Sequence, residues 1–238
     1  MIQTECPIID KIFNAVVEGY TIINMTTHQT PILQLTNVNI QRGDLILCQD
    51  VSVTLKAGEI CHLKGANGAG KTTLLMQLAG ILPIFLDNTN LDDTNRLSYR
   101  PLYVSHQLGI HPDLTVQQNL VFLLNLYGLY PSPPQIANAL NTVGLNGYQA
   151  ISCRQLSAGQ TRRVNLARLW LMQKNDSPLW LLDEPFTALD ASMVTKLQDK
   201  IRAFADNGGA VLMTSHQLDG MHNLADTVLD LSYYLANG

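Results

Sequence analysis

The chain has few charged side chains and no excess of basic ones. Asp, Glu, Lys and Arg together make up 14% of its 238 residues, and the formal net charge is −4. Without a broad basic surface, binding to nucleic acid or to an anionic lipid surface is not expected. Because so little of the surface is charged, much of it must consist of Asn, Gln, Ser and Thr, which favours a protein that is docked to a partner.

Long hydrophobic runs and paired cysteines are also missing. No apolar run approaches the ~18 residues that a membrane-spanning helix needs, and residues 120–126 are interrupted by Asn125. Glu5 and Asp10 stand where a secretion signal carries basic charge. The cysteines have neither C-x-x-C nor zinc spacing, so we expect free thiols in a reducing cytosol at Cys6, Cys48, Cys61 and Cys153. Any work at a membrane is therefore expected to be done through a partner.

The most informative stretch that is present is residues 65–72. Its sequence, GANGAGKT, matches the phosphate-binding pattern G-x-x-x-x-G-K-[ST] at every required position. Residues 60–63 before it read as a buried strand, and the apolar spacing after it predicts a helix over 72–82 that Pro83 stops. Glycines let backbone N–H groups surround phosphate oxygens, and the helix adds its positive end. We therefore predict that the chain binds a nucleoside triphosphate.

Individual residues of this loop take predicted roles. Lys71 can reach the outer phosphates, and the Thr72 hydroxyl can ligate Mg²⁺. The residues predicted to bind the nucleotide here are Gly65, Ala66, Asn67, Gly68, Ala69, Gly70, Lys71, Thr72 and Thr73.

A second motif is the apolar strand predicted at 179–182, which is followed by Asp183 and Glu184. Because side chains alternate along a strand, we expect the two carboxylates to point in different directions and to act differently. Asp183 is predicted to hold Mg²⁺, as the aspartate after the second strand does in phosphate-loop enzymes. Glu184 is then free to act as general base toward water.

Two further polar positions stand at the ends of predicted elements. Ser157 and Gly159 open a helix predicted over 158–172, where they could either bind phosphate or simply cap the helix. His216 follows a strand predicted at 210–214, and a lone histidine there is more often structural than catalytic.

The order of elements predicts an α/β fold with a mostly parallel sheet covered on both faces. Residues 108–156 form a predicted small helical subdomain, and residues 84–98 an exposed excursion. The other predicted strands are 33–40, 45–55 and 102–104; the other predicted helices are 116–126, 135–143 and 191–206, with a breaker at 130–134.

Residues 1–31 are predicted to be an extension ahead of one domain over 32–238. Apolar residues from Ile8 to Val17 predict a short amphipathic helix that ends at Gly19. Two alternatives stay open: either Met25 is the true initiator, or the extension packs on a partner.

Together these motifs resemble the nucleotide-binding subunit of an ABC transporter, over about residues 33–220. The family has five marker elements that occur here in its order: a glutamine at Gln107, the signature at 156–160, a catalytic glutamate at Glu184, the D-loop at 188–190 and a switch histidine at His216. The resemblance implies an ATP hydrolase of the phosphate-loop fold, with ATP and Mg²⁺ as cofactors. It also implies an antiparallel β subdomain beside the parallel sheet.

The resemblance further implies a site shared between two copies of the chain. In a homodimer, Ser157, Gly159 and Gln160 of one subunit would meet the ATP held by the glycine loop of the other. Glu184, His216, Lys71 and Gln107 would be catalytic, and Gln107 would join Thr72 and Asp183 at the metal while linking the site to the membrane partner.

The chain departs from the family pattern at two positions. Arg42 stands where the family usually stacks an aromatic on adenine, so it is predicted to stack on the base as a flat cation, unless it points to solvent. Ala158 replaces the commoner glycine of the signature, a mild change.

Within the family, the compact length, Arg42 and the segments 103–109, 156–170 and 185–190 look like the ATP-binding subunit of the haem exporter of bacterial cytochrome c maturation. That implies a peripheral protein on the cytoplasmic face of the inner membrane, bound to an integral-membrane transporter subunit of the haem exporter and to other cytochrome c maturation proteins. The chain has no C-x-x-C-H haem motif, so it would power the step without carrying haem. The segment 156–170 includes Arg162, Arg163 and Arg168, which could equally be a solvated or intrahelical set of charges.

Three alternatives remain at this point: an ATPase of another transporter (for lipoprotein, a metal or a small molecule), a soluble mechanical ABC protein, or a degenerate cassette that binds ATP only for regulation.

Overall fold

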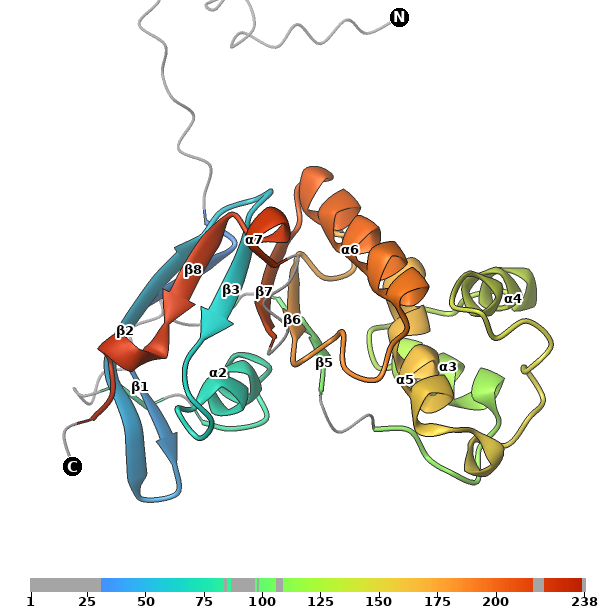
Figure 1. Ribbon diagram of the computed structural model, residues 1–238, viewed down its shortest axis with the longest axis horizontal. Coiled ribbons are helices and arrows are strands. Elements are labelled where there is room, and N and C mark those ends of the chain that lie inside the picture. Colours follow the sequence, from blue (N-terminus) through green and yellow to red (C-terminus); the bar gives the residue numbers. More distant parts are fainter. Residues whose placement is uncertain are drawn as a thin grey trace, which may run out of the picture.

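The computed structural model describes residues 31–83, 85–86, 97, 99–105, 109–215 and 221–236. The helix predicted at 8–17 and the remainder of the extension up to residue 30 lie outside this range. Two β-sheets and a group of helices make up the described part (Figure 1). Within it, no helix combines the length and the apolar character needed to cross a membrane.

The larger sheet is parallel and has the strand order β5-β6-β7-β3-β8. Its strands are β5 (Leu102–Val104), β6 (Leu179–Leu182), β7 (Ala210–Thr214), β3 (Ile60–Lys64) and β8 (Thr227–Asp230). Every residue of the central strands β6 and β7 is buried, as expected where a parallel sheet is covered on both faces. The predicted α/β class is confirmed. The edge strand β8 was not predicted; it is four residues long and half of its residues are exposed.

The smaller sheet is antiparallel, with the order β2-β1-β4. The strands β1 (Leu33–Arg42) and β2 (Leu45–Leu55) form a hairpin that turns at Gly43, whose φ of 61° suits glycine. The antiparallel β subdomain implied by the family resemblance is thus present. The short strand β4 (Phe85–Leu86) pairs with β1, so the segment predicted as an exposed excursion over 84–98 contributes a strand to this sheet.

Helices lie on the side of the parallel sheet that is opposite the antiparallel sheet. There α3 (Val116–Asn125), α4 (Pro133–Thr142) and α5 (Ala158–Ala167) lie together (Figure 1). A capping box starts each of them, at Thr115, Ser132 and Ser157. Pro133 begins α4 and does not interrupt it, because proline at the first helical position costs no hydrogen bond. The helix predicted over 158–172 ends as α5 at Ala167 and continues as the short 3-10 helix η4 (Arg168–Trp170). Another short 3-10 helix, η3 (Cys153–Gln155), precedes α5.

The remaining described helices lie between or beside the parallel strands in the chain. They are α2 (Lys71–Leu78) after β3, α6 (Ala191–Asp206) between β6 and β7, α7 (Met221–Leu224) before β8 and η5 (Leu231–Tyr233) after it. The α6 bounds are those predicted. The Phe204 ring on α6 stacks on Trp180 of β6, with ring centroids 3.7 Å apart.

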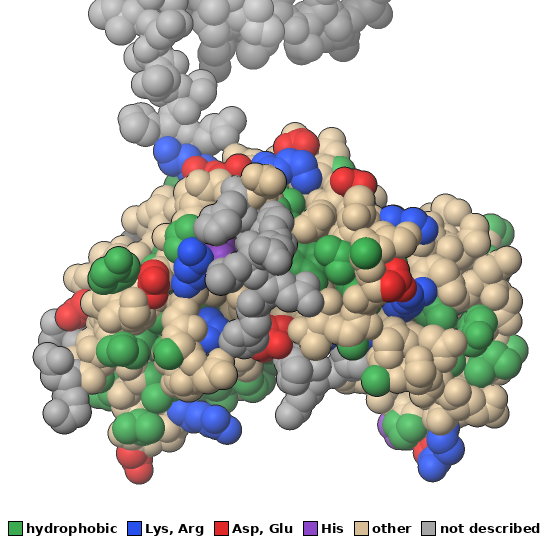
Figure 2. Space-filling view, viewed as in Figure 1, with side chains coloured by type: hydrophobic (Ala, Val, Ile, Leu, Met, Phe, Trp, Pro, Cys, Tyr) green, Lys and Arg blue, Asp and Glu red, His purple; other side chains and the backbone are tan. Residues whose placement is uncertain are grey.

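Two hydrophobic cores lie on the two faces of the parallel sheet. Alternate residues of β6 enter different cores: Trp180 and Leu182 pack with the helices α3 to α6, whereas Leu179 and Leu181 pack with α2 and the antiparallel sheet. Outside these cores, one face of the molecule carries charged side chains singly or in small groups among uncharged ones (Figure 2). That pattern agrees with the low charge of the sequence.

Candidate nucleotide site

The glycine loop connects β3 to α2 at the carboxyl edge of the parallel sheet. Gly70 has a φ of 100°, and a Cβ there would lie 2.9 Å from Cγ2 of Ile40. Gly65 has a φ of 146°, and its Cβ would lie 3.1 Å from that of Ala69. Both positions therefore require glycine, for backbone conformation and for space. Residues 66–68 are exposed, so this part of the loop backbone can receive a ligand.

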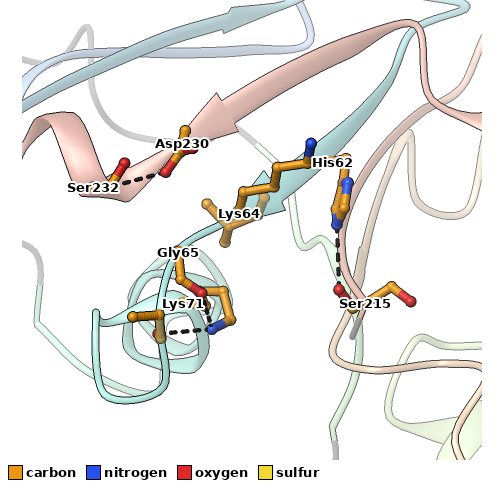
Figure 3. A pocket seen from close by; sticks show the side chains of 9 residues that line it. His62, Lys64, Gly65, Lys71, Ser215, Asp230 and Ser232 are labelled. Carbon is orange, nitrogen blue, oxygen red and sulfur yellow. Dashed lines mark hydrogen bonds between the residues drawn. The ribbon is translucent and has the colours of Figure 1, made fainter. Parts of the chain in front are cut away.

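Lys71 lies over this loop, where its Nζ donates to the carbonyl oxygens of Gly65, at 2.7 Å, and of Ala66, at 2.9 Å (Figure 3). A cavity of 390 Å³ adjoins the lysine. Its lining includes Lys64 and Asp230 from the ends of β3 and β8 and Ser215 after β7 (Figure 3). The carboxyl ends of three parallel strands therefore open toward the loop, the usual ligand edge of such sheets.

A hydrogen-bonded chain links the start of α2 to the ends of β6 and β7. Thr72 Oγ1 donates to Asp183 Oδ2 at 2.9 Å, and Thr214 Oγ1 donates to Asp183 Oδ1 at 2.8 Å. Asp183 is 2% exposed. A hydroxyl beside a carboxylate is the oxygen donor set that Mg²⁺ takes, so Thr72 and Asp183 fit that ion. The structure thus brings together two of the three predicted metal ligands.

Glu184 follows Asp183 but leaves the strand. β6 ends at Leu182, and Glu184 has a φ of 49° in the left-handed region. Its N–H donates to Thr214 Oγ1 at 2.8 Å, and its Oε2 accepts from Thr187 Oγ1 at 3.4 Å. Strand alternation does not set the directions of the two carboxylates, because both residues lie beyond the end of β6 and Glu184 adopts a left-handed conformation.

Three buried polar residues in or near this site received no role from the sequence. Thr214, fully buried, joins Asp183 to the Glu184 backbone, and its only sequence signal is a threonine at the end of an apolar strand. Arg162 is 4% exposed and donates to carbonyl oxygens of three residues outside its own helix. Arg168, 5% exposed, donates to the carbonyl oxygen of Tyr103. Neither arginine is therefore the solvated or intrahelical charge that remained an alternative.

The predicted signature residues lie at the start of α5. Ser157 caps this helix: its Oγ accepts from the Gln160 N–H at 3.2 Å, and Gln160 Oε1 accepts from the Ser157 N–H at 2.9 Å. A Cβ on Gly159 would lie 3.1 Å from the Ala188 carbonyl oxygen, so glycine allows the segment after Glu184 to approach. Figure 1 shows α5 well away from α2, so one chain does not bring the signature to its own glycine loop.

The remaining predicted site residues are divided between the hairpin and undescribed segments. Arg42 is exposed at the end of β1, next to the hairpin turn. Gln107 and His216 lie outside the described residues. Within the described part, no cluster of three or more His, Cys, Asp or Glu residues could hold a metal.

The glycine loop, the buried aspartate beside Thr72 and the parallel sheet define a phosphate-loop nucleotide-binding protein. A family model described as "ABC transporter" matches residues 48–187, more than half of the chain. Among solved structures, a putative ABC transporter ATP-binding protein from Pyrococcus furiosus has a TM-score of 0.68 at 21% identity, covering 85% of this chain and 98% of that one. The cassette MJ0796, in a dimeric post-hydrolysis state bound to ADP and Pi, has a TM-score of 0.66 at 25% identity, covering 83% and 94%.

The curated relatives narrow this class. Cytochrome c biogenesis ATP-binding export protein CcmA of Saccharophagus degradans is 39% identical over 82% of this chain and 90% of its own length. CcmA of Vibrio cholerae is 41% identical, covering 78% and 91%. The chain belongs to the CcmA family of ABC transporter ATPases. The predicted resemblance is confirmed for the ABC class and for the cytochrome c branch, and the chain is an ATP-hydrolysing transporter subunit.

Proposed function

We propose that this chain powers haem export, or the release of a haem-loaded chaperone, during bacterial cytochrome c maturation. The observation that carries its ATPase chemistry is the chain of hydrogen bonds from Thr72 through Asp183 and Thr214 to Glu184, beside a loop with the phosphate-binding sequence. The printed names of the relatives, which are ATP-binding export proteins of cytochrome c biogenesis, support the biological step. An ATPase of another transporter is the alternative.

ATP is proposed to lie on residues 65–73. Lys71 leaves the Gly65 and Ala66 carbonyls and turns toward the outer phosphates, exchanging two neutral acceptors for charged oxygens. Thr72 and Asp183 would hold Mg²⁺, with Gln107 as a third ligand, and the bound ion would neutralise charge at the phosphate oxygens. Arg42, exposed at the end of β1, stacks on the base.

Glu184 is proposed as the general base that takes a proton from the attacking water. Asp183 is buried and hydrogen-bonded to Thr72 and Thr214, whereas the Glu184 carboxylate accepts the long bond from Thr187. His216 contacts the γ-phosphate and the water. Ser157, Gly159 and Gln160 complete the site from a second copy of the chain, because α5 and α2 of one copy lie apart (Figure 1). Closure of the two copies excludes bulk water and completes the site around the attacking water.

We further propose a homodimer bound peripherally to an integral-membrane subunit of the haem exporter, on the cytoplasmic face of the inner membrane, with other cytochrome c maturation proteins attached. No nucleic-acid partner is proposed. The dimeric state of MJ0796 at similar fold supports the pairing. In this proposal residues 1–31 are an extension, 32–238 are the ATPase domain and 108–156 are its helical subdomain. Gln107, just before the subdomain, links the site to the membrane partner.

The test is co-purification from membranes with tagged wild-type chain and Glu184→Gln. We expect both to retain a membrane subunit and cytochrome c maturation proteins, and the variant to lose ATP hydrolysis by roughly 100-fold or more while trapping a haem-loaded chaperone. Glu59→Gln, the same change at a turn before β3, is the matched control and should hydrolyse ATP like wild type. An unrelated permease in the pull-down would remove the haem assignment. Unchanged hydrolysis in Glu184→Gln would remove the general base.

A further inference from the structure

The Arg162 guanidinium lies buried among backbone carbonyl groups of two neighbouring strand ends. Its NH1 donates to the Ser105 oxygen at 2.9 Å, and its NH2 donates to the oxygens of Asp183, at 3.2 Å, and Glu184, at 2.6 Å. Arg162 belongs to α5, the helix that the signature opens. One side chain therefore joins three separate elements: α5, the segment after β5 and the segment after β6.

The position of β5 explains why these acceptors are available. β5 is an edge strand, and its Val104 carbonyl accepts from the Asp183 N–H on the β6 side. Along a strand, carbonyls alternate in direction, so those of Tyr103 and Ser105 face away from the sheet. Arg168 pairs with the first and Arg162 with the second. The two arginines thus satisfy the open side of this edge strand.

Glu184 is held at both ends of its backbone. A non-glycine residue in the left-handed region is strained and persists only where its surroundings determine it. Here the Thr214 hydroxyl accepts from the Glu184 N–H, and Arg162 donates to its carbonyl oxygen. Removing either contact frees the peptide to rotate, and the carboxylate would move with it.

We propose that Arg162 is a positioning residue for ATP hydrolysis, which holds the Glu184 backbone in its left-handed conformation and ties it to α5 and to the segment that leads to Gln107. This rests on the proposed role of Glu184 as general base. Arginine suits the position because its planar, permanently charged fork can donate to several fixed oxygens at once. A lysine ammonium is a single point on a flexible stem and would not reproduce that geometry.

The electrostatics show what this arrangement costs. Burial lowers the pKa of Arg162, while the charges of Asp183 and Glu184 act in the opposite direction. A buried guanidinium is expensive unless several acceptors and nearby negative charge compensate it. Here the backbone oxygens of Asp183 and Glu184 accept its hydrogen bonds, and their carboxylates supply the negative charge, so the burial of Arg162 and the site geometry depend on each other.

Arg168 offers a matched control within the same molecule. It follows α5, is as deeply buried as Arg162 and also donates to an outward carbonyl of β5, at 2.7 Å. The hydrogen bond that Arg168 donates to the Tyr103 carbonyl oxygen does not involve Glu184. Loss of Arg168 should therefore reproduce the structural cost of losing a buried arginine without moving the general base.

The test compares steady-state ATPase kinetics of Arg162→Gln, Arg162→Lys and Arg168→Gln in the tagged complex purified from membranes, alongside thermal unfolding and binding of a fluorescent ATP analogue. For Arg162→Gln we expect kcat to fall by roughly tenfold or more, because a small misplacement of a catalytic group is costly, with KM and analogue affinity changed less than about twofold. Arg162→Lys should lie between this variant and wild type. Arg168→Gln should lower the unfolding temperature similarly and kcat by less than about twofold.

A double variant identifies the route of the effect. If Arg162 acts through Glu184, Arg162→Gln should cause no further loss of kcat when it is added to Glu184→Gln. Equal losses of kcat in the Arg162 and Arg168 variants, a parallel loss of analogue binding, or additive effects with Glu184→Gln would overturn the proposal. If Arg162→Gln does not fold, the same comparison of kcat, analogue binding and the double variant is made with Arg162→Lys. Wild-type activity in Glu184→Gln alone would instead refute the general base itself.

Discussion

At the scale of single residues, the site depends on buried polar groups that have partners. Asp183 and Thr214 are almost completely buried, and each of their hydrogen bonds connects a different element. Cys48 adds a third case beneath the glycine loop, where its Sγ donates to the Ala69 carbonyl at 3.3 Å. Burial raises the pKa of this thiol, which keeps it protonated and able to donate. Cys48, Cys61 and Cys153 are free thiols, as predicted; Cys6 lies outside the described residues.

Thr214→Val tests the hydrogen-bonded group at residue scale. Valine has nearly the same shape, but it leaves Asp183 Oδ1 and the Glu184 N–H without their shared partner. We expect the free energy of unfolding to fall by about 1–3 kcal/mol, the usual cost of unpaired buried polar groups, measured by urea denaturation. Thr195→Val on the exposed face of α6 is the control and should change it by less than about 0.5 kcal/mol. Equal effects of both changes would contradict the expectation.

At the scale of elements, α6 connects the catalytic segment to the helical side of the molecule. Its N-cap, Asp190, accepts from the Met193 N–H at 2.9 Å and also pairs with Arg163 of α5. Asp190 is the last residue of the segment that the family uses as its D-loop. The start of α6 is therefore fixed both by its own first turn and by the signature helix.

Asp190→Asn should change how stability depends on pH. The hydrogen bond from the Met193 N–H, and then the charge of Arg163, lower the pKa of Asp190 below the ordinary value of 3.8. The folded state therefore holds this proton less tightly than the unfolded state. The stabilisation is present above the unfolded pKa and is lost as pH falls through the folded pKa.

We accordingly expect wild type to be more stable than Asp190→Asn near neutral pH, and the difference to shrink in acid below about pH 4. Urea denaturation in a pH series measures it. Asp206→Asn, at the other end of α6, is a suitable control. A difference that stays constant over the whole series would show that the carboxylate charge is not responsible.

At the scale of the whole molecule, the glycine loop lies where the two sheets meet. The chain after β8 crosses to the antiparallel sheet, and Leu231 is buried against the loop. The Gln49 N–H of β2 donates to the Tyr234 carbonyl oxygen, and the Ala236 N–H donates to the Leu47 carbonyl oxygen of β2. Both sheets, and the hydrophobic core between them, therefore contribute to the surroundings of one loop. A ligand that orders this loop is expected to stabilise the fold as a unit.

ATP with Mg²⁺ should raise the unfolding temperature, by an amount that grows with the logarithm of its concentration above Kd. At a ligand concentration of 100 Kd the expected stabilisation is about 2.7 kcal/mol. Lys71→Ala removes the group proposed to reach the phosphates and should abolish most of the shift, measured by differential scanning fluorimetry. Lys56→Ala, at an exposed turn, should leave the shift intact. A shift of full size in Lys71→Ala would argue against nucleotide binding on this loop.

The sequence alone determined the parts whose cause is local. The glycine loop, the apolar strand before Asp183 and the bounds of α6 all follow from short patterns, because neighbouring residues set backbone conformation and periodic burial. The capping of α5 by Ser157 is of the same kind. The family resemblance then followed from the order of these motifs. The division into domains and the roles of Gln107, His216 and Arg42 remain predictions.

Only the tertiary structure decided which distant residues meet. Thr72 and Asp183 are 111 positions apart, and Arg162 reaches Ser105 across 57. The short strands β4 and β8 form because a partner strand is present, and Glu184 takes its left-handed conformation because Thr214 and Arg162 hold it. No local pattern encodes these contacts, since each depends on free backbone groups that appear only when the sheet has assembled.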